Sequence, residues 1–271
     1  MTNLVFDPGV SGGRVSTIMK SVAHEAGRML RLQQGDNPKR VAKGSHDFST
    51  GADIASQEMI RRMLGAAVPD VPVVTEEDDA PKLTSTCFII DPLDGTYNYS
   101  VGGSDWGVVI GLIVHGSPVR AVLYMPLSDL MVEVALGEGV RMNGLQIEPP
   151  PERSLKESII GTEIVWSNPD GFIDYVVKPL QKQCLGLVCP LSACAGLVKL
   201  LRGEIAAYVN LTHGKVWDFV VHALAMEVWG GAALAPDGRA LEWDRLPMQG
   251  VFTPHKAIAE HLLTLTRWVS S

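Results

Sequence analysis

Residues 88–98 of the chain read Phe-Ile-Ile-Asp-Pro-Leu-Asp-Gly-Thr-Tyr-Asn. The apolar run Phe88–Ile90 predicts a buried strand, and it ends abruptly in Asp91 and Asp94. Ligands collect at strand ends in α/β proteins, because loops diverge there. The intervening proline restricts the turn, so the two carboxylates and the Leu93 carbonyl could converge on one point. Three oxygen ligands from one turn suit Mg²⁺, which requires a compact octahedral shell.

The two residues after this turn are suited to bind an anion. Gly95 lets a ligand approach the backbone closely, and the N–H groups of Gly95 and Thr96 could donate to phosphate oxygens. A bare pair of aspartates at a strand end would more often simply terminate the strand. The longer string Asp-Pro-Leu-Asp-Gly-Thr is rarely needed to make a turn, so it favours a functional site.

Two further acidic segments lie elsewhere in the chain. Glu76 and Glu77 follow a predicted strand at residues 71–74, whereas the adjacent Asp78 and Asp79 have the pattern of a solvated charge run. Asp218 follows Trp217 at the start of an apolar helix, and on its own it would be interpreted as a helix cap.

Several carboxylates that converge would repel one another, and some would have to protonate. Bound divalent cations remove this repulsion and supply the positive charge that a phosphate needs. The chain has a net charge of -7, which argues against nucleic acid as the main partner, because nucleic acid is bound by clustered Lys and Arg. Acidic residues with bound metal would therefore form one anion-binding site on an acidic protein.

Apolar periodicity predicts an α/β layered architecture. A stiff run at Pro149–Pro151 is the best candidate boundary, which divides the chain into an N-terminal α+β lobe (1–148) with most metal ligands and a C-terminal α/β lobe (149–271) that completes the site. Helices are expected at residues 15–32, 53–64, 171–180, 193–201, 217–229 and 257–269, strands at 71–74, 88–90, 107–114, 119–124 and 131–135 and around Ile159, Val188 and Ala207, a loop or hairpin at 35–46, and a tight turn at Asn143-Gly144.

Four of these segments resemble motifs of the inositol monophosphatase family, within the superfamily of magnesium-dependent, lithium-sensitive phosphatases. Residues 91–96 match the family's most specific motif, and Glu76-Glu77 match its paired glutamates. Residues 47–53 (Asp-Phe-Ser-Thr-Gly-Ala-Asp) are similar to its early Asp-x-Val-Thr-x-x-Asp segment. Trp217-Asp218 followed by Gly230-Gly231 resemble its C-terminal motif, so the resemblance covers nearly the whole chain.

The resemblance implies a fold, a reaction and a set of residue roles. The fold is an αβαβα sandwich of the sugar phosphatase type, and the reaction is hydrolysis of inositol monophosphate or a related polyol or sugar phosphate by metal-activated water. Two or three Mg²⁺ ions would be held by Glu76, Asp91, the Leu93 carbonyl, Asp94 and Asp218. Asp53 and Thr96 would help to activate the water and complete the catalytic set. Substrate contacts would come from Gly95, Thr96, Ser192, Ala193, Asn210 and Asp218.

Three departures from the family pattern concern the substrate. The family's Gly-Ser/Thr-Ala segment is Leu191-Ser192-Ala193 here, so its glycine is missing. A glutamate that contacts the inositol ring in animal members aligns with Asn210, and the usual Glu-Ala before the paired glycines is Val228-Trp229. None of these changes removes a metal ligand. We therefore expect a broad phosphomonoesterase with only a modest preference for inositol monophosphate.

Other readings stay open at this stage. Fructose-1,6-bisphosphatase, histidinol-phosphatase and phosphoadenosine phosphate phosphatase activities share this fold. A catalytically idle scaffold that binds protein or RNA would have lost part of the metal set, whereas the set here is complete.

The location and assembly of the protein are expectations as well. The first ten residues lack a basic stretch followed by an apolar core, and no apolar run is long enough to span a bilayer. The four cysteines show no paired CxxC spacing that would indicate a zinc site, and we expect them to be small buried side chains in a reducing compartment. We expect a cytoplasmic homodimer that does not associate with membranes.

Overall fold

The computed structural model describes residues 8–35, 40–43, 48–164 and 167–266. The apolar run Phe88–Ile90 and the two aspartates that follow it lie in β4 (Cys87–Asp94), inside a sheet of seven strands with the order β3-β4-β5-β6-β7-β8-β9. β3 and β4 are parallel, and all later neighbours are antiparallel. The other strands are β3 (Val73–Thr75), β5 (Gly107–Val114), β6 (Ser117–Met125), β7 (Leu130–Ala135), β8 (Gly139–Met142) and β9 (Leu145–Ile147).

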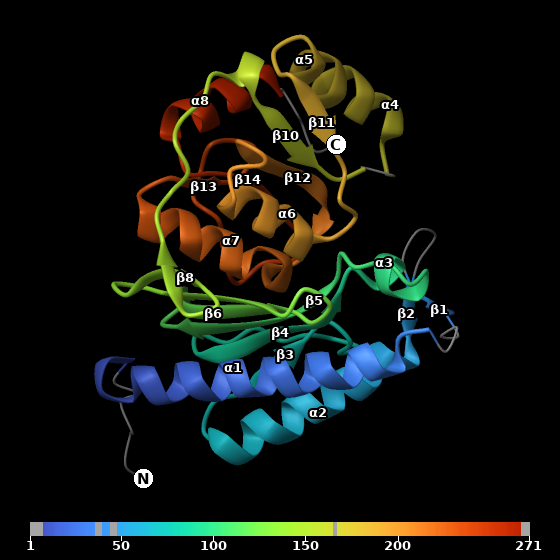
Figure 1. The fold of residues 1–271 in the computed structure, drawn as a ribbon, viewed down its shortest axis with the longest axis vertical. Coiled ribbons are helices and arrows are strands. Elements are labelled where there is room, and N and C mark those ends of the chain that lie inside the picture. The colour runs from blue at the N-terminus through green and yellow to red at the C-terminus, as the bar shows by residue number, and fades with distance from the viewer. Residues whose placement is uncertain (1–7, 36–39, 44–47, 165–166, 267–271) are drawn as a thin grey trace.

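Helices cover one face of this sheet. α1 (Pro8–Gln33) and α2 (Gly51–Ala67) lie side by side beneath it in Figure 1. Met19 and Leu30 of α1 and Ile60 of α2 are fully buried against strand residues such as Phe88. Every residue of β4 and β5 is buried, because the sheet is covered on both faces where these strands run.

Two helices fill the space between this sheet and a second one, which has the strand order β11-β10-β12-β14-β13. α6 (Ala193–Leu201) and α7 (Val216–Trp229) form this middle layer. α7 is apolar around most of its circumference because it is buried on both sides. The strands of the second sheet are β10 (Ile159–Thr162), β11 (Gly186–Val188), β12 (Ala207–Gly214), β13 (Ala232–Leu234) and β14 (Met248–Thr253).

An outer helical layer covers the far face of the second sheet. It contains α4 (Pro169–Phe172), α5 (Lys178–Gln181) and α8 (Lys256–Leu265). A π-helical turn, Ile173–Val177, joins α4 to α5, so the helix expected at residues 171–180 is a composite. The layers therefore alternate as αβαβα, and the expected fold class is confirmed.

The remaining differences from the expected elements are local. α1 begins at Pro8, and α8 ends at Leu265; the expected last helical residues from 267 onward lie outside the described residues. Four strands, β8, β9, β13 and β14, were not expected. The first three have only three or four residues, and runs this short carry little periodicity. β14 is longer, but Gly250 interrupts its apolar pattern. In the segment expected to be a loop or hairpin, β1 (Arg40–Ala42) pairs with β2 (Phe48–Thr50), and residues 44–47 between them lie outside the described ranges.

The run Pro149–Pro151 connects the first sheet to the second. One apolar core nevertheless contains residues from both, including Ile89 of β4 and Phe252 of β14. The division into two lobes stays a prediction. Within the described ranges, no helix is both long and apolar enough to cross a bilayer.

Close packing of α7 against the first sheet requires a glycine in β5. A Cβ atom at Gly111 would lie 2.7 Å from a Val220 methyl group on α7 and 3.0 Å from Ile89. We expect Gly111→Ala to lower the free energy of unfolding by about 1–3 kcal/mol through overpacking. Urea unfolding measures this change.

The matched control is Gly65→Ala in α2, where an added Cβ meets no atom within 4 Å. There the alanine should raise the free energy of unfolding by about 0.5–1 kcal/mol, because it favours the helix. Equal effects of the two substitutions would contradict the packing argument.

Candidate active site

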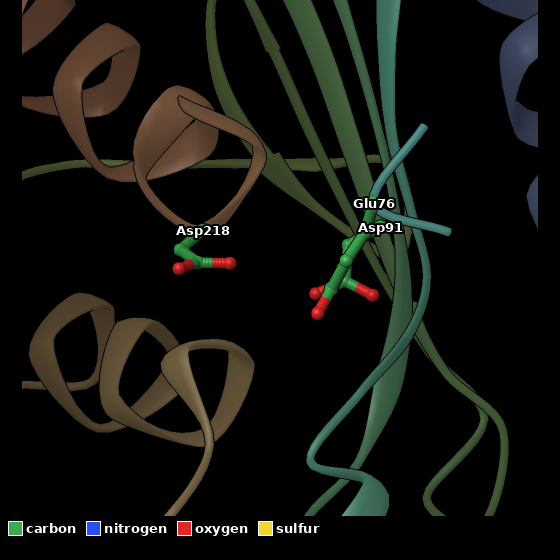
Figure 2. Close-up of side chains that lie close together, drawn as sticks. All are labelled: Glu76, Asp91 and Asp218. Carbon is green, nitrogen blue, oxygen red and sulfur yellow. The ribbon is translucent and has the colours of Figure 1, made fainter. Parts of the chain in front are cut away.

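Three carboxylates from three separate elements meet at one edge of the first sheet (Figure 2). Glu76 directly follows β3, and its N–H donates to the carbonyl of Ile90 over 3.1 Å. Asp91 lies on β4, and Asp218 reaches across from the first turn of α7. Each side chain offers an oxygen atom, and these three oxygens lie within 4.8 Å of one another.

Burial and the charges of neighbouring carboxylates disfavour ionisation of Asp91 and Asp218. Burial raises the pKa of Asp91 well above its ordinary value, and the nearby Glu76, Asp94 and Asp218 raise it further. Burial is also the main cause of the strongly raised pKa of Asp218, followed by the charge of Glu76. A cation between the carboxylates would offset both the cost of burying their charges and the repulsion between them. Hard oxygen atoms at this spacing fit a divalent ion such as Mg²⁺.

Asp94, three residues further along β4, is held by the middle layer instead. One of its oxygens accepts from the Ala193 N–H at 3.0 Å, and the other accepts from the Cys194 N–H at 2.9 Å and from the Ser192 hydroxyl. Its charge thus lies at the N-terminus of α6, where the helix dipole favours it. Burial raises the pKa of Asp94, and the hydrogen bond from Ser192 offsets only part of this increase.

Ser192 and Ala193 were expected to contact substrate. In the structure they bind Asp94 and so couple the turn after β4 to α6. Gly95 lies in the left-handed region, at φ 78°, and a Cβ there would lie 2.5 Å from the carbonyl of Asp105 and 3.1 Å from Ser192. Only glycine fits this turn, because of both the backbone conformation and the close contacts.

Asp53 and Thr96 are brought together as the family resemblance implies. Asp53 is fully buried in the first turn of α2, where one of its oxygens accepts from the Thr50 N–H and hydroxyl. The Thr96 hydroxyl lies 3.0 Å from the other Asp53 oxygen and 3.0 Å from the Leu93 carbonyl. The hydroxyl has one proton and donates to one of them at a time. Asp47, in the same motif, lies outside the described residues.

Sequence reasoning missed Lys43, because its segment was expected to be a loop or hairpin. Its ammonium group lies 3.1 Å from Glu76 and also contacts Glu77. Burial alone would lower the pKa of Lys43, but the charges of Glu76 and Glu77 raise it above its usual value. The contact is long-range, so no local sequence pattern could have indicated it.

Asp78 and Asp79 belong to the same acidic run as Glu76 but lie outside the cluster. Asp78 accepts from the Thr75 N–H and pairs with Arg61, while Asp79 is exposed. Their interpretation as non-ligand positions agrees with this arrangement.

Glu163 is a second residue that sequence reasoning missed. It follows β10, is almost completely buried, and accepts from the Tyr208 hydroxyl at 2.8 Å and from the Cys189 thiol at 3.4 Å. Burial raises its pKa from 4.5 to about 7. The signal available in the sequence was a carboxylate directly after an apolar strand, as at Glu76.

Asn210 belongs to the same polar cluster. Its side-chain oxygen accepts from the N–H of Thr212 at 3.1 Å and from the Thr212 hydroxyl at 2.7 Å, and its amide donates to Tyr208 at 3.5 Å. Asn210 is buried, so its hydrogen-bonding capacity is largely used inside the protein. Its expected contact with substrate stays a prediction.

The trio should destabilise the protein when no metal is present. We expect Asp91→Asn to raise the free energy of unfolding in chelator at pH 8 by about 1–3 kcal/mol, because it removes a buried charge. Added Mg²⁺ should then stabilise the wild-type protein more than the variant. Thermal unfolding with and without Mg²⁺ measures both effects. Asp79→Asn, an exposed position in the same acidic run, is the control, and an unchanged Mg²⁺ response in Asp91→Asn would remove Asp91 from the metal site.

Glu163 should make stability depend on pH. Between pH 4.5 and about 7 the native state binds more protons than the unfolded state, so stability falls as pH rises through this window. Glu163→Gln keeps an acceptor for Tyr208 and should raise the free energy of unfolding by about 1–3 kcal/mol at pH 8, with little gain at pH 5. Denaturant unfolding at both pH values, with the exposed Glu152→Gln as control, tests this. A gain of equal size at both pH values would show that ionisation is not the cause.

Comparisons with known proteins identify relatives of this chain in sequence and in fold. The chain is 29% identical over 230 residues to inositol monophosphatase 2 of Solanum lycopersicum (80% of this chain, 85% of that one). It is 26% identical over 217 residues to Nus factor SuhB of Pasteurella multocida (77% and 80%). Its fold matches the suhB structure from Bartonella henselae with a TM-score of 0.85 at 22% identity (94% and 98% covered). A structure of an IMPase/NADP phosphatase complexed with Mg²⁺ and phosphate matches with a TM-score of 0.81 at 19% identity (93% and 95%). A sequence profile of the inositol monophosphatase family matches residues 14–270, and the chain therefore belongs to this family of metal-dependent phosphatases.

Proposed function

We propose that the protein is a magnesium-dependent phosphomonoesterase that hydrolyses small polyol or sugar phosphates. The observation that carries this proposal is the convergence of Glu76, Asp91 and Asp218 within 4.8 Å, beside the buried Asp94. Two or three Mg²⁺ would be held by these four carboxylates and the Leu93 carbonyl. When bound, the ions would supply positive charge to the phosphoryl oxygens and lower the pKa of the attacking water.

The residues of the chain orient the reactants. One Asp53 oxygen accepts a hydrogen bond from the Thr96 hydroxyl, which leaves the Thr96 oxygen lone pairs free to accept a hydrogen bond from water. That water is then positioned for in-line attack on phosphorus. The N–H groups of Gly95 and Thr96 donate to the phosphoryl oxygens, and the Asp218 carboxylate accepts a hydrogen bond from a hydroxyl of the alcohol. The bond between phosphorus and the alcohol oxygen breaks on the side opposite the attacking water. The water loses one proton to solvent, and the leaving alkoxide takes up one proton from solvent to become the alcohol.

The related structure that holds Mg²⁺ and phosphate supports this class of reaction. The identity of the alcohol is less constrained. Inositol monophosphate is one candidate, and fructose 1,6-bisphosphate, histidinol phosphate and phosphoadenosine phosphate are others. The Asn210 side chain is neutral and hydrogen-bonds to Thr212 and Tyr208, so it offers no charged group to a ring hydroxyl. This favours broad specificity. Lithium inhibition, a homodimer and a cytoplasmic location are further expectations.

A scaffold without catalytic activity is the alternative from another class. Relatives named Nus factor SuhB make it worth testing, and the expectation that nucleic acid is not a main partner stays a prediction. The complete set of carboxylates favours an enzyme, because a non-catalytic protein gains nothing from the charge repulsion they create.

Phosphate release separates these functions. The purified protein with Mg²⁺ should release phosphate from inositol 1-phosphate, glycerol 2-phosphate, fructose 1,6-bisphosphate and histidinol phosphate, and chelator should abolish the release. Asp218→Asn should lower kcat/KM by about 100-fold or more, the scale of one lost electrostatic contact in the transition state. Asp170→Asn is the matched control, since Asp170 is an exposed aspartate in the first turn of α4.

Absence of Mg²⁺-dependent release from every ester would leave the scaffold as the better account. A preference of a thousandfold for one substrate would contradict the broad specificity inferred from Asn210.

A further inference from the structure

Leu191 has an unusual backbone conformation for its residue type. Among the residues that the structure describes, four non-glycine residues have positive φ: His115, Asp129, Asn143 and Leu191. The first three are polar residues in turns between consecutive strands, where this conformation is tolerated. Leu191, at φ 54°, is the apolar one, and it lies in the loop before α6.

The loop that carries Leu191 is fixed to the candidate active site from two sides. The Asn98 amide of α3 (Thr96–Ser100) donates to the carbonyls of Pro190 and Leu191, at 3.0 and 3.3 Å. The next residue, Ser192, donates to Asp94 and lies against Gly95. Leu191 is therefore held one residue away from the turn that would bind the phosphate.

Packing does not explain this leucine. Its side chain is 40% exposed, although the backbone conformation is one that glycine adopts without strain. Strained residues of this kind collect at functional sites, where the surrounding contacts fix them. Ligand sites commonly combine a few polar anchors with apolar surface.

We propose that Leu191 is a specificity-determining residue that contacts the alcohol part of the substrate. The proposal rests on the phosphatase function proposed above. The leucine methyl groups would cover an apolar face of the alcohol, such as the C–H face of a sugar or polyol ring or an aromatic ring. Glycine at this position would leave that face in water. The leucine therefore favours phosphate esters of alcohols that present an apolar face beside the ester oxygen.

The experiment compares Leu191→Gly and Leu191→Asn with the wild-type protein. Both replacements tolerate positive φ, so the loop should keep its conformation. The substrates are benzyl phosphate and glycerol 2-phosphate, two alkyl esters that differ in the apolar surface of the alcohol. Both variants should lose about tenfold in kcat/KM for benzyl phosphate, mainly through KM, and less than about twofold for glycerol 2-phosphate.

His115→Gly is the matched control. His115 has a similar φ of 51° and is exposed in the turn between β5 and β6, so its replacement releases the same backbone strain. It should leave the ratio of the two kcat/KM values unchanged. An equal loss on both substrates in the Leu191 variants, or no loss, would overturn the proposal.

A binding measurement makes the result independent of turnover. Titration calorimetry with benzylphosphonate and methylphosphonate, in the presence of Mg²⁺, should show about tenfold weaker binding of benzylphosphonate to Leu191→Asn, and unchanged binding of methylphosphonate. If the wild-type protein hydrolyses nothing but this difference is seen, the phosphatase function fails and the role of Leu191 in ligand choice stands. If hydrolysis occurs and neither readout depends on Leu191, the function stands and the role of Leu191 fails.

Discussion

Like charges held together at a partly buried site are the constraint on which the rest of this structure depends. Glu76, Asp91 and Asp218 come from three elements, and each would be more stable further from the others. What keeps them together is apolar packing elsewhere: β4 is buried along its whole length, and α7 is packed on both sides. The apolar surface buried by the rest of the fold stabilises the protein enough to offset this repulsion, and local costs of this kind are common at functional sites.

The turn after β4 connects this packing to the candidate active site. Asp94 has both oxygens occupied by the first residues of α6, so its carboxylate also joins two layers of the protein. An amide side chain at this position would direct an NH₂ group at a backbone N–H, so here a metal-ligand candidate and a structural anchor are the same residue. Within the described part of the chain, Asp91 accepts a hydrogen bond from the Leu93 N–H and Asp218 accepts one from the Lys215 N–H, and each bond uses only one of the two carboxylate oxygens.

Local sequence was sufficient to predict the longer helices and strands and the motif at residues 91–96. β5 and α6 have the bounds expected from their apolar runs, because both are long enough to show a period. Short edge strands such as β9 and β13 depend on pairing with distant strands and lack such a signal. The contacts of Lys43 with Glu76 and of Glu163 with Tyr208 span 33 and 45 residues, so only the folded chain brings them together. The carboxylates could be named beforehand because their motif resembles a family, whereas their partners could not.

The position of Asp218 on α7 also determines when the site can exist during synthesis. A ribosome completes β3 and β4, and with them Glu76 and Asp91, more than a hundred residues before it reaches α7. Until then, the face of the first sheet that α7 later covers has no partner within its own chain, and the apolar residues Ile89 and Val109 on that face are left open. Domains generally fold as units during synthesis, and exposed sheet faces are prone to aggregation. The late arrival of one helix therefore both closes the core and completes the carboxylate cluster, so a truncated chain would lack both.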